Sequence, residues 1–224
     1  IIASLSEGDG SQLTTSRFIH PYTQNTLSVF SALAKTSKLD AALRLESAHG
    51  NHDCVETSLG EEWQQQPIWH ETGAQKTGVI TRRTDFRPIK ASIIQGPMIY
   101  CANPLYKTPK KISNTHKAFD PIDLSLVSDD YFPRTNFGPA MEMASYRDQF
   151  TACQWDVTKR HVDFFRLGVR CMVALNSERS LVAAIIPPGV AHVHAVESLS
   201  FRKEKNLLRA QALMASLVAD FFVK

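Results

Sequence analysis

Two clusters place an arginine beside hydroxyl and amide or carboxylate groups. Arg134, Thr135 and Asn136 lie between aromatic residues, and Glu178, Arg179 and Ser180 precede an apolar run. Guanidinium, hydroxyl and carboxamide groups read the edges of guanine and adenine or hold phosphates. The same residue types also form turns, in which the Arg satisfies buried carbonyls and the Asn or Ser acts as a cap. The residues alone leave both interpretations open.

The positive charge is concentrated in the middle of the chain. Between residues 82 and 117 the only acidic residue is Asp85, and the basic ones are Arg82, Arg83, Arg87, Lys90, Lys107, Lys110, Lys111 and Lys117. Such a segment can neutralise phosphates and release counterions. The alternative is a solvated basic loop without a ligand. Residues 118–148 are rich in Asp, so the cation density is local.

The segment Asn103-Pro104-Leu105-Tyr106 is one residue away from the Asn-Pro-Pro-aromatic segment with which adenine-modifying enzymes hold an extruded base. Asn-Pro is also an ordinary start of a turn. No glycine-rich turn for a methyl donor accompanies it, because the glycines are isolated except for Gly8 and Gly10 in a polar stretch. We therefore predict a turn or β-bulge here and assign no catalytic residue.

Other catalytic and metal-binding patterns are incomplete. His192 and His194 could share one face of a strand, and His49, His52 and Cys54 are close in sequence, but neither group has a further ligand in view. Asp123 and the pair Asp129-Asp130 lack the Glu-x-Lys that a nuclease would need. The P-loop, the dinucleotide fingerprint and the Gly-x-Ser-x-Gly elbow are absent. We expect no metal in this chain.

The composition is that of an ordinary globular protein. The 224 residues are 43% hydrophobic and carry a formal net charge of +3, which by itself does not establish a polyanion partner. The four Cys are spread without a CxxC pair, and no apolar run is long enough to cross a membrane, so we expect a cytoplasmic protein without a membrane partner. The chain begins with Ile1 and ends in an apolar helical pattern, which suggests a piece of a longer polypeptide.

The elements that must position these residues change in type near residue 79. Residues 1–16 are expected to be a loop, Thr26–Ser47 has helical periodicity, and the rest up to residue 78 is irregular. Beyond it, β-branched and aromatic runs indicate strands. These runs are Val79–Ile80, Ala91–Cys101 broken at Gly96-Pro97, Val162–Val173, Ser180–Ile186 and Ala191–Phe201.

These runs predict an α/β (α+β) fold of two parts. A helical or irregular segment, 1–78, precedes a twisted mixed β-sheet domain, 79–224. Met141–Lys159 has a helical pattern, and Asn206–Val223 is apolar nearly all round, so we expect the latter to be a buried closing helix or one covered by another domain.

Four segments in this order resemble the C-terminal region of type IIG-like restriction-modification and phage-defence N6-adenine DNA methyltransferases. They are GPMIYCANPLYKTPKK (96–111), FDPIDLSLVSDDYFPRTNF (119–137), NSERSLVAAIIPPGVAHVHAV (176–196) and LLRAQALMASLVADFF (207–222). In that family this region is the target-recognition domain, which lies against duplex DNA and selects the site to be methylated. The likeness covers about the last 130 residues.

The resemblance implies a DNA-specificity fragment that serves a methyltransferase domain of the same longer polypeptide. S-adenosylmethionine would be bound by that domain, and this chain would hold no cofactor. The residues implied to contact DNA, or to support loops that do, are Lys107, Thr108, Lys110, Arg134, Thr135, Asn136, Glu178, Arg179 and Ser180, and the charge pattern adds Arg82, Arg83 and Lys111. The alternatives are a divergent catalytic methyltransferase that uses Asn103–Tyr106, and an assembly module of a phage-defence complex.

Overall fold

The computed structural model describes residues 63–65, 69–83, 91–111, 118–172 and 177–223. All of them belong to one compact unit, Gly60–Lys224. The helices predicted for Thr26–Ser47 and the histidines at positions 49 and 52 lie outside the described residues, as do the cations Arg87, Lys90 and Lys117.

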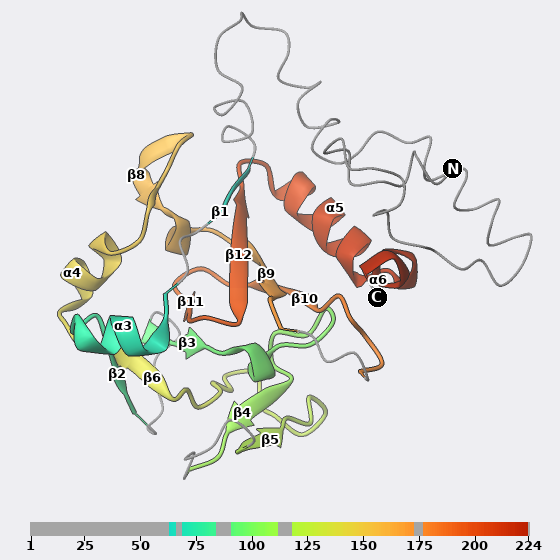
Figure 1. Cartoon of the computed structure of the whole chain (residues 1–224), viewed down its shortest axis with the longest axis horizontal. Coiled ribbons are helices and arrows are strands. Elements are labelled where there is room, and N and C mark those ends of the chain that lie inside the picture. Colours follow the sequence, from blue (N-terminus) through green and yellow to red (C-terminus); the bar gives the residue numbers. More distant parts are fainter. Residues whose placement is uncertain (1–62, 66–68, 84–90, 112–117, 173–176, 224) are drawn as a thin grey trace, which may run out of the picture. The chain divides into compact units, whose positions relative to one another are not determined.

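The first sheet has four antiparallel strands in the order β1-β12-β9-β10 (Figure 1). The strands are β1 (Trp63–Gln65), β12 (Val196–Phe201), β9 (Arg166–Arg170) and β10 (Ala183–Ile186). The edge strand β1 comes from residues that the sequence placed in the N-terminal part of the chain. It pairs with the second half of β12, in the register Trp63 to Phe201.

The second sheet has the order β11-β3-β6-β2 and is mixed. Its strands are β11 (Ala191–His192), β3 (Ile93–Ile94), β6 (Phe137–Pro139) and β2 (Ile80–Arg82). β11 runs parallel to β3, whereas β6 is antiparallel to both of its neighbours. With its helices, the unit therefore has the predicted mixed α/β fold, in which most strand pairs are antiparallel.

Apolar side chains cover both faces of the first sheet. On one face Leu167 and Ala183 pack against Leu207 and Ala210 of helix α5 (Glu204–Ala215). On the other face, residues of the strands pack with the segment around the 3-10 helix η3 (Gly96–Met98), which forms at the predicted Gly96-Pro97 turn; the buried members are Ile94, Met98, Ile99, Ala184, Ile186, Val190 and Val196. The exclusion of these side chains from water holds the sheet between the two layers.

A separate core lies under the second sheet. Ile80, Ile93 and Phe137 of its strands pack with Tyr146 and Phe150, which flank or belong to helix α4 (Met143–Asp148). Trp69 and helix α3 (Glu71–Lys76) close the same cluster. Trp69 contacts Phe150 with a ring-centroid separation of 4.7 Å.

Two small hairpins extend from this framework: β4 (Lys107–Pro109) with β5 (Phe119–Pro121), and β7 (Ala152–Cys153) with β8 (Asp156–Arg160). The second hairpin shows that the helix predicted for Met141–Lys159 is wrong beyond Asp148. Cys153 pairs with Asp156 across a tight turn, and the exposed Val157 and Thr158 are β-branched residues that favour a strand.

The predicted C-terminal helix is confirmed as a helical region but is divided in two, α5 and α6 (Leu217–Val223). Ser216 has an extended backbone, and its hydroxyl donates to the carbonyl of Leu213 and accepts from the amide of Ala219. The region is also less buried than its composition predicts, because Leu208, Leu213, Leu217, Val218 and Phe221 are exposed. None of the helices in the described ranges has the length and apolar character that a membrane crossing requires.

The apolar run Ala191–Phe201 is divided as well. Ala195 has a φ of 80°, in the left-handed region that a non-glycine residue rarely adopts. The turn at this residue directs β11 into the second sheet and β12 into the first. The segment predicted as one strand is thus two strands that belong to different sheets. Ala195, between them, lines a cleft.

Candidate nucleic-acid interface

Arg82 and Arg83 lie at the end of β2, at the edge of the second sheet, and both are exposed. Arg82 is opposite Phe137 in the β2–β6 ladder. The Arg83 amide donates to the carbonyl of Asn136 with an N–O distance of 2.6 Å. The backbone at this pair is therefore fixed by the segment that precedes β6.

The β4–β5 hairpin supplies the other described cations of the basic segment. Lys107 lies over the Tyr106 ring, with its Nζ 4.7 Å from the ring centroid, and Tyr106 stacks on Tyr100 at 4.8 Å. Lys110 and Lys111 are exposed at the end of the hairpin, and the Lys110 Nζ is 3.8 Å from Asp120. This exposed ion pair is screened by water and neutralises the hairpin only in part.

Residues 134–136 connect the two cationic segments. The Arg134 Nε donates to the carbonyl of Pro109 at 2.9 Å, and its Nη2 lies 3.6 Å from Asp120. The buried hydroxyl of Thr108 donates to the carbonyl of Arg134 at 3.2 Å. The backbone carbonyl of Asn136 also accepts from the Arg83 amide. This short segment therefore contacts both β2 and the β4–β5 hairpin and links them. We use the name cationic edge for the exposed Arg82, Arg83, Lys110 and Lys111 together with the half-buried Lys107.

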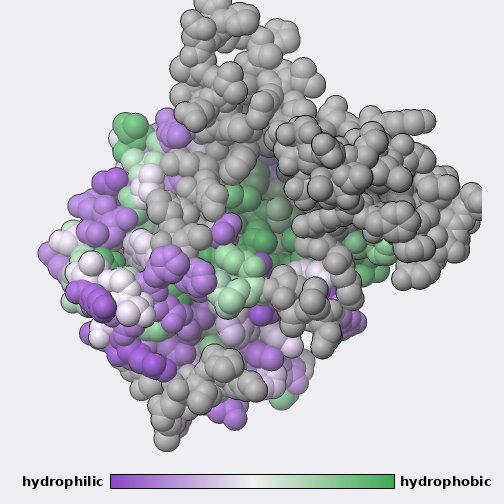
Figure 2. Space-filling view, in the orientation of Figure 1, coloured by the Kyte–Doolittle hydropathy of each residue, from purple (hydrophilic) through white to green (hydrophobic). Residues whose placement is uncertain are grey.

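The cationic edge lies on a largely hydrophilic part of the unit. Hydrophilic residues predominate in the lower part of Figure 2, where Figure 1 places β2, β4 and β5. Hydrophobic residues are visible higher up, over the first sheet. Sequence reasoning predicted these five cations as DNA contacts, and the structure places them on two segments that both contact residues 134–136.

The remaining predicted residues of this region are engaged inside the fold. Thr135 is buried, and its hydroxyl donates to the carbonyl of Phe137. The carboxamide nitrogen of Asn136 donates to the side-chain oxygen of Gln95 at 2.7 Å, and the Gln95 nitrogen donates to Glu71 at 3.1 Å. Thr108, Arg134 and Thr135 therefore support the interface, whereas Asn136 belongs to a chain of polar groups that faces a cleft.

That cleft has a volume of about 620 Å³ and lies between the two sheets. Its polar lining comes from α3, β2, the β3–η3 segment, the residue before β6, β9 and the turn after β11; the residues include Glu71, Arg82, Gln95, Asn136, Arg170 and His194. His194 stacks on His70 with ring centroids 4.8 Å apart. Arg82 and Asn136 were predicted as DNA contacts, and His194 was considered only as a metal ligand. No sequence pattern grouped these residues, because they come from six separated segments.

The second predicted cluster, Glu178 to Ser180, lies near α6, and two of its members are structural. The Arg179 Nε is 3.3 Å from the Asp220 carboxylate, and its Nη2 donates to the carbonyl of Ala215 at 2.9 Å. Asp220 also accepts from the backbone amides of Ser180 and Leu181. Arg179 and Ser180 thus fasten the α5–α6 junction, and Glu178 is exposed.

The environment of Asp220 is consistent with an ionised carboxylate. Burial alone would raise its pKa, but the hydrogen bonds from Leu181 and Ser180 and the Arg179 charge outweigh burial, so the pKa lies below its ordinary value. The ion pair that Arg179 makes there is largely excluded from solvent, since only 13% of the Arg179 side chain is exposed.

Asn103 to Tyr106 form the predicted turn. The side-chain oxygen of Asn103 accepts from the Leu105 amide at 2.9 Å, and Asn103 and Tyr100 exchange backbone hydrogen bonds. The Tyr106 ring lies against Tyr100. An Asn in this arrangement stabilises the turn with the same oxygen that would accept from an adenine amino group.

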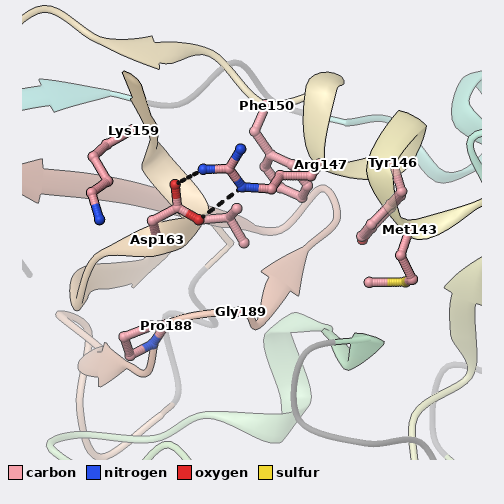
Figure 3. A pocket seen from close by; sticks show the side chains of 9 residues that line it. Met143, Tyr146, Arg147, Phe150, Lys159, Asp163, Pro188 and Gly189 are labelled. Carbon is pink, nitrogen blue, oxygen red and sulfur yellow. Dashed lines mark hydrogen bonds and ion pairs between the residues drawn. The ribbon is translucent and has the colours of Figure 1, made fainter. Parts of the chain in front are cut away.

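A second cavity, of about 360 Å³, lies beside α4 and the turn Pro188-Gly189 (Figure 3). Its most polar feature is the pair formed by Arg147 and Asp163, whose Nη2 and Oδ2 atoms are 2.5 Å apart (Figure 3). This hydrogen bond and the Asp163 charge raise the pKa of Arg147. Asp163 therefore engages the guanidinium that lines this cavity.

The histidines at positions 192 and 194 have different environments. His192 is buried and hydrogen-bonds Ser198 at 2.7 Å, whereas His194 faces the cleft. Within the described residues, no three His, Cys, Asp or Glu side chains gather in a way that could hold a metal ion. Comparison of the chain with protein-family models, curated proteins and solved structures found no match.

Proposed function

We propose that this chain is a DNA target-recognition fragment of a bacterial restriction-modification adenine-specific DNA methyltransferase. The single observation that carries the proposal is the cationic edge, in which residues 134–136 hold Arg82–Arg83 and the Lys107–Lys111 hairpin together. The resemblance of four ordered segments to type IIG-like recognition regions supports the same function. The duplex DNA would lie along this edge, inside the bacterial cytoplasm.

The physical basis is neutralisation of the DNA backbone. Exposed Lys and Arg side chains replace condensed counterions at the phosphates, and their release drives binding at low salt. Contacts of this kind position the protein without reading bases, so the sequence would be read by loops that extend beyond the edge. Thr108 and Arg134 contribute by holding residues 134–136 against the hairpin, and Thr135 stabilises that segment through Phe137.

Catalysis is assigned to another part of the longer polypeptide. The methyltransferase domain would supply S-adenosylmethionine and the Asn-Pro-Pro-aromatic segment, and this chain would present the duplex to it. The oxygen of Asn103 is used within its turn, which favours this division of labour over a catalytic role for Asn103–Tyr106.

The test is the salt dependence of DNA binding by the 224-residue chain. For B-DNA, the logarithm of the association constant falls with the logarithm of the salt concentration with a slope of about −0.9 per neutralised phosphate. Five cations at the interface predict a slope between about −3 and −5. Lys110→Ala with Lys111→Ala should make the slope less steep by about 2, measured by filter binding or fluorescence anisotropy.

The matched control replaces two cations on α5, with Lys205→Ala and Arg209→Ala, which are exposed and lie on a helix that packs against the first sheet. This variant has the same loss of net charge and should keep the wild-type slope. A slope near zero for the unmodified chain, or equal slopes for both double variants, would refute the proposed interface.

The exposed apolar side chains of α5 and α6 favour a second candidate, an assembly module of a phage-defence complex. Leu208, Leu213 and Leu217 are more than half exposed, which is unusual for a helix in contact with water alone. In this case the chain should associate with itself or with a partner and show no salt-dependent DNA binding. A DNA-binding monomer in analytical ultracentrifugation would exclude it.

A further inference from the structure

We propose that the cleft between the two sheets is a binding site for a single nucleotide, with its phosphate and its base both held by protein. The inference deepens the proposed function and rests on it where the nucleotide belongs to DNA. The same chemistry would also be satisfied by a free nucleotide. The experiments below separate these two sources.

The charged groups of the cleft suit a phosphate. Arg82 and Arg170 both line it, from β2 in one sheet and β9 in the other. Guanidinium groups bind phosphate oxygens through paired hydrogen bonds. Glu71 is the carboxylate in the lining, and it accepts a hydrogen bond from Gln95. The described lining therefore carries more positive than negative charge.

The uncharged groups suit a base. The carboxamides of Gln95 and Asn136 both line the cleft, and such groups hydrogen-bond the edges of purines. Both are oriented by their neighbours, since Asn136 donates to Gln95 and Gln95 donates to Glu71. This chain of hydrogen bonds fixes the direction of each amide before a ligand arrives, which lowers the entropic cost of binding.

Flat surfaces are present as well. The stacked rings of His70 and His194 belong to the lining, and Phe119 of β5 also lines the cleft. Base stacking on flat side chains is tolerant of sequence and contributes about 1–3 kcal/mol per base. The volume of about 620 Å³ lies in the range of about 300–1,000 Å³ typical of small-molecule sites.

The cleft adjoins the cationic edge through Arg82, which belongs to both. Phe119 also links them, because β5 pairs with β4, the strand that carries Lys107. A duplex that lies on the edge would therefore have an unstacked nucleotide within reach of the cleft. The free energy of unstacking and unpairing is smaller for a nucleotide that is already unpaired in the duplex, so such a nucleotide should enter the cleft more readily.

The first experiment measures binding of deoxyadenosine and deoxyguanosine 5′-monophosphates to the 224-residue chain by isothermal titration calorimetry. We expect saturable binding of at least one, and binding at least tenfold weaker for the matching nucleoside, which lacks the phosphate. Arg170→Gln should weaken binding about tenfold, and Arg209→Gln, the same change on exposed α5, should have no effect.

Arg170 is partly buried, so its variant could fail for structural reasons. The second variant is therefore Met172→Trp. Met172 lines the cleft and is 61% exposed, so a larger side chain there should block the ligand without removing a buried group. Thermal unfolding of each variant reports whether the fold persists. Loss of binding in a folded Met172→Trp chain supports the site.

The second experiment distinguishes the source of the nucleotide. We compare a fully paired duplex with one that carries a single extra unpaired nucleotide. Tighter binding of the second duplex, lost with Met172→Trp but not with Lys110→Ala and Lys111→Ala, identifies a nucleotide of DNA. Binding of the monophosphate without this preference identifies a free nucleotide.

The proposal is overturned if no monophosphate binds at millimolar concentration and the duplexes bind alike, even when salt-dependent DNA binding is intact. Conversely, binding of monophosphates without any duplex binding would refute the proposed function and leave the cleft assignment standing. The two failures are therefore distinguishable in the same samples.

Discussion

At the scale of single residues, the most unusual feature is a charged side chain in the interior. Arg166 of β9 is fully buried and donates to the carbonyl of Val190. Burial lowers its pKa to about 10. Two buried histidines occupy the same region, each bonded to a serine of β12 at 2.7 Å: His192 with Ser198, and His161 with Ser200. The interior of this unit is thus partly polar.

These histidines should make stability depend on pH. Burial, and next the charge of Arg166, lowers the pKa of His161 to about 4 and that of His192 to about 3. In the unfolded chain both histidines take up protons near pH 6.5. The contribution of the neutral buried rings to the free energy of unfolding is therefore fully present above that pH and decreases below it. We expect the free energy of unfolding to fall between pH 6.5 and 5 with a limiting slope of about 1.4 kcal/mol per pH unit for each histidine.

The measurement is urea unfolding across this pH range, where most carboxylates are still ionised. His192→Gln should remove up to half of the slope, and Ser198→Ala should lower stability by about 1–3 kcal/mol because it leaves a buried ring nitrogen without its partner. A free energy of unfolding that is constant from pH 7 to pH 5 would contradict the buried neutral state of both rings.

At the scale of elements, strand packing depends on Gly168 in the centre of β9. A Cβ built at this position would overlap the Cδ1 of Ile186 and lie 2.8 Å from its Cγ1. We expect Gly168→Ala to destabilise the fold by about 1–3 kcal/mol, as overpacking does. Adding Ile186→Val removes the overlapping methyl group and should recover part of the loss, so the double-mutant cycle should be non-additive.

Gly73 provides the matched control. It lies in α3, and a Cβ there would meet nothing within 4 Å. Gly73→Ala should therefore stabilise the helix by about 0.5–1 kcal/mol. Equal effects of the two Gly→Ala changes in thermal or urea unfolding would show that the β9–β10 contact is looser than described.

The elements also show which features the sequence could reveal. Runs of β-branched and aromatic residues predicted the segments that contain β2, β3, β9, β10, β11 and β12, because period and composition are local properties. The other described strands, β1 and β4 to β8, are short and were not predicted. The division of Ala191–Phe201 was missed since Ala195 adopts a positive φ without being glycine. The break at Ser216 had a signal, a serine within an apolar run, which caps the amide of Ala219.

The candidate site was predictable only in part for a related reason. The exposure of Lys110 and Lys111 follows from a charged hairpin, but the engagement of Arg179 by Asp220 joins residues 41 positions apart in the chain. Likewise, the cleft takes its lining from elements that no local pattern relates. Such contacts are set by tertiary packing, which a single sequence does not display.

At the scale of the whole unit, the arrangement of the sheets relates the two proposed binding surfaces. The second sheet and the β4–β5 hairpin carry the cationic edge, and the first sheet contributes Arg170 to the cleft. The Ala195 turn connects the two sheets beside that cleft. In the proposed function, a duplex bound to the cationic edge would lie close to Arg170, which belongs to the first sheet.

The pairing of β1 with β12 determines where the chain can be shortened. Without residues 63–65, the amide and carbonyl groups along Ser200 and its neighbours would form an unprotected rim on the first sheet. A fragment that starts at Pro67 keeps Trp69 and α3 but lacks β1, so it should associate through intermolecular strand addition, whereas one that starts at Gly60 should not. Light scattering of the two purified fragments at equal concentration checks this, and equal monodispersity would mean that β1 does not protect the rim.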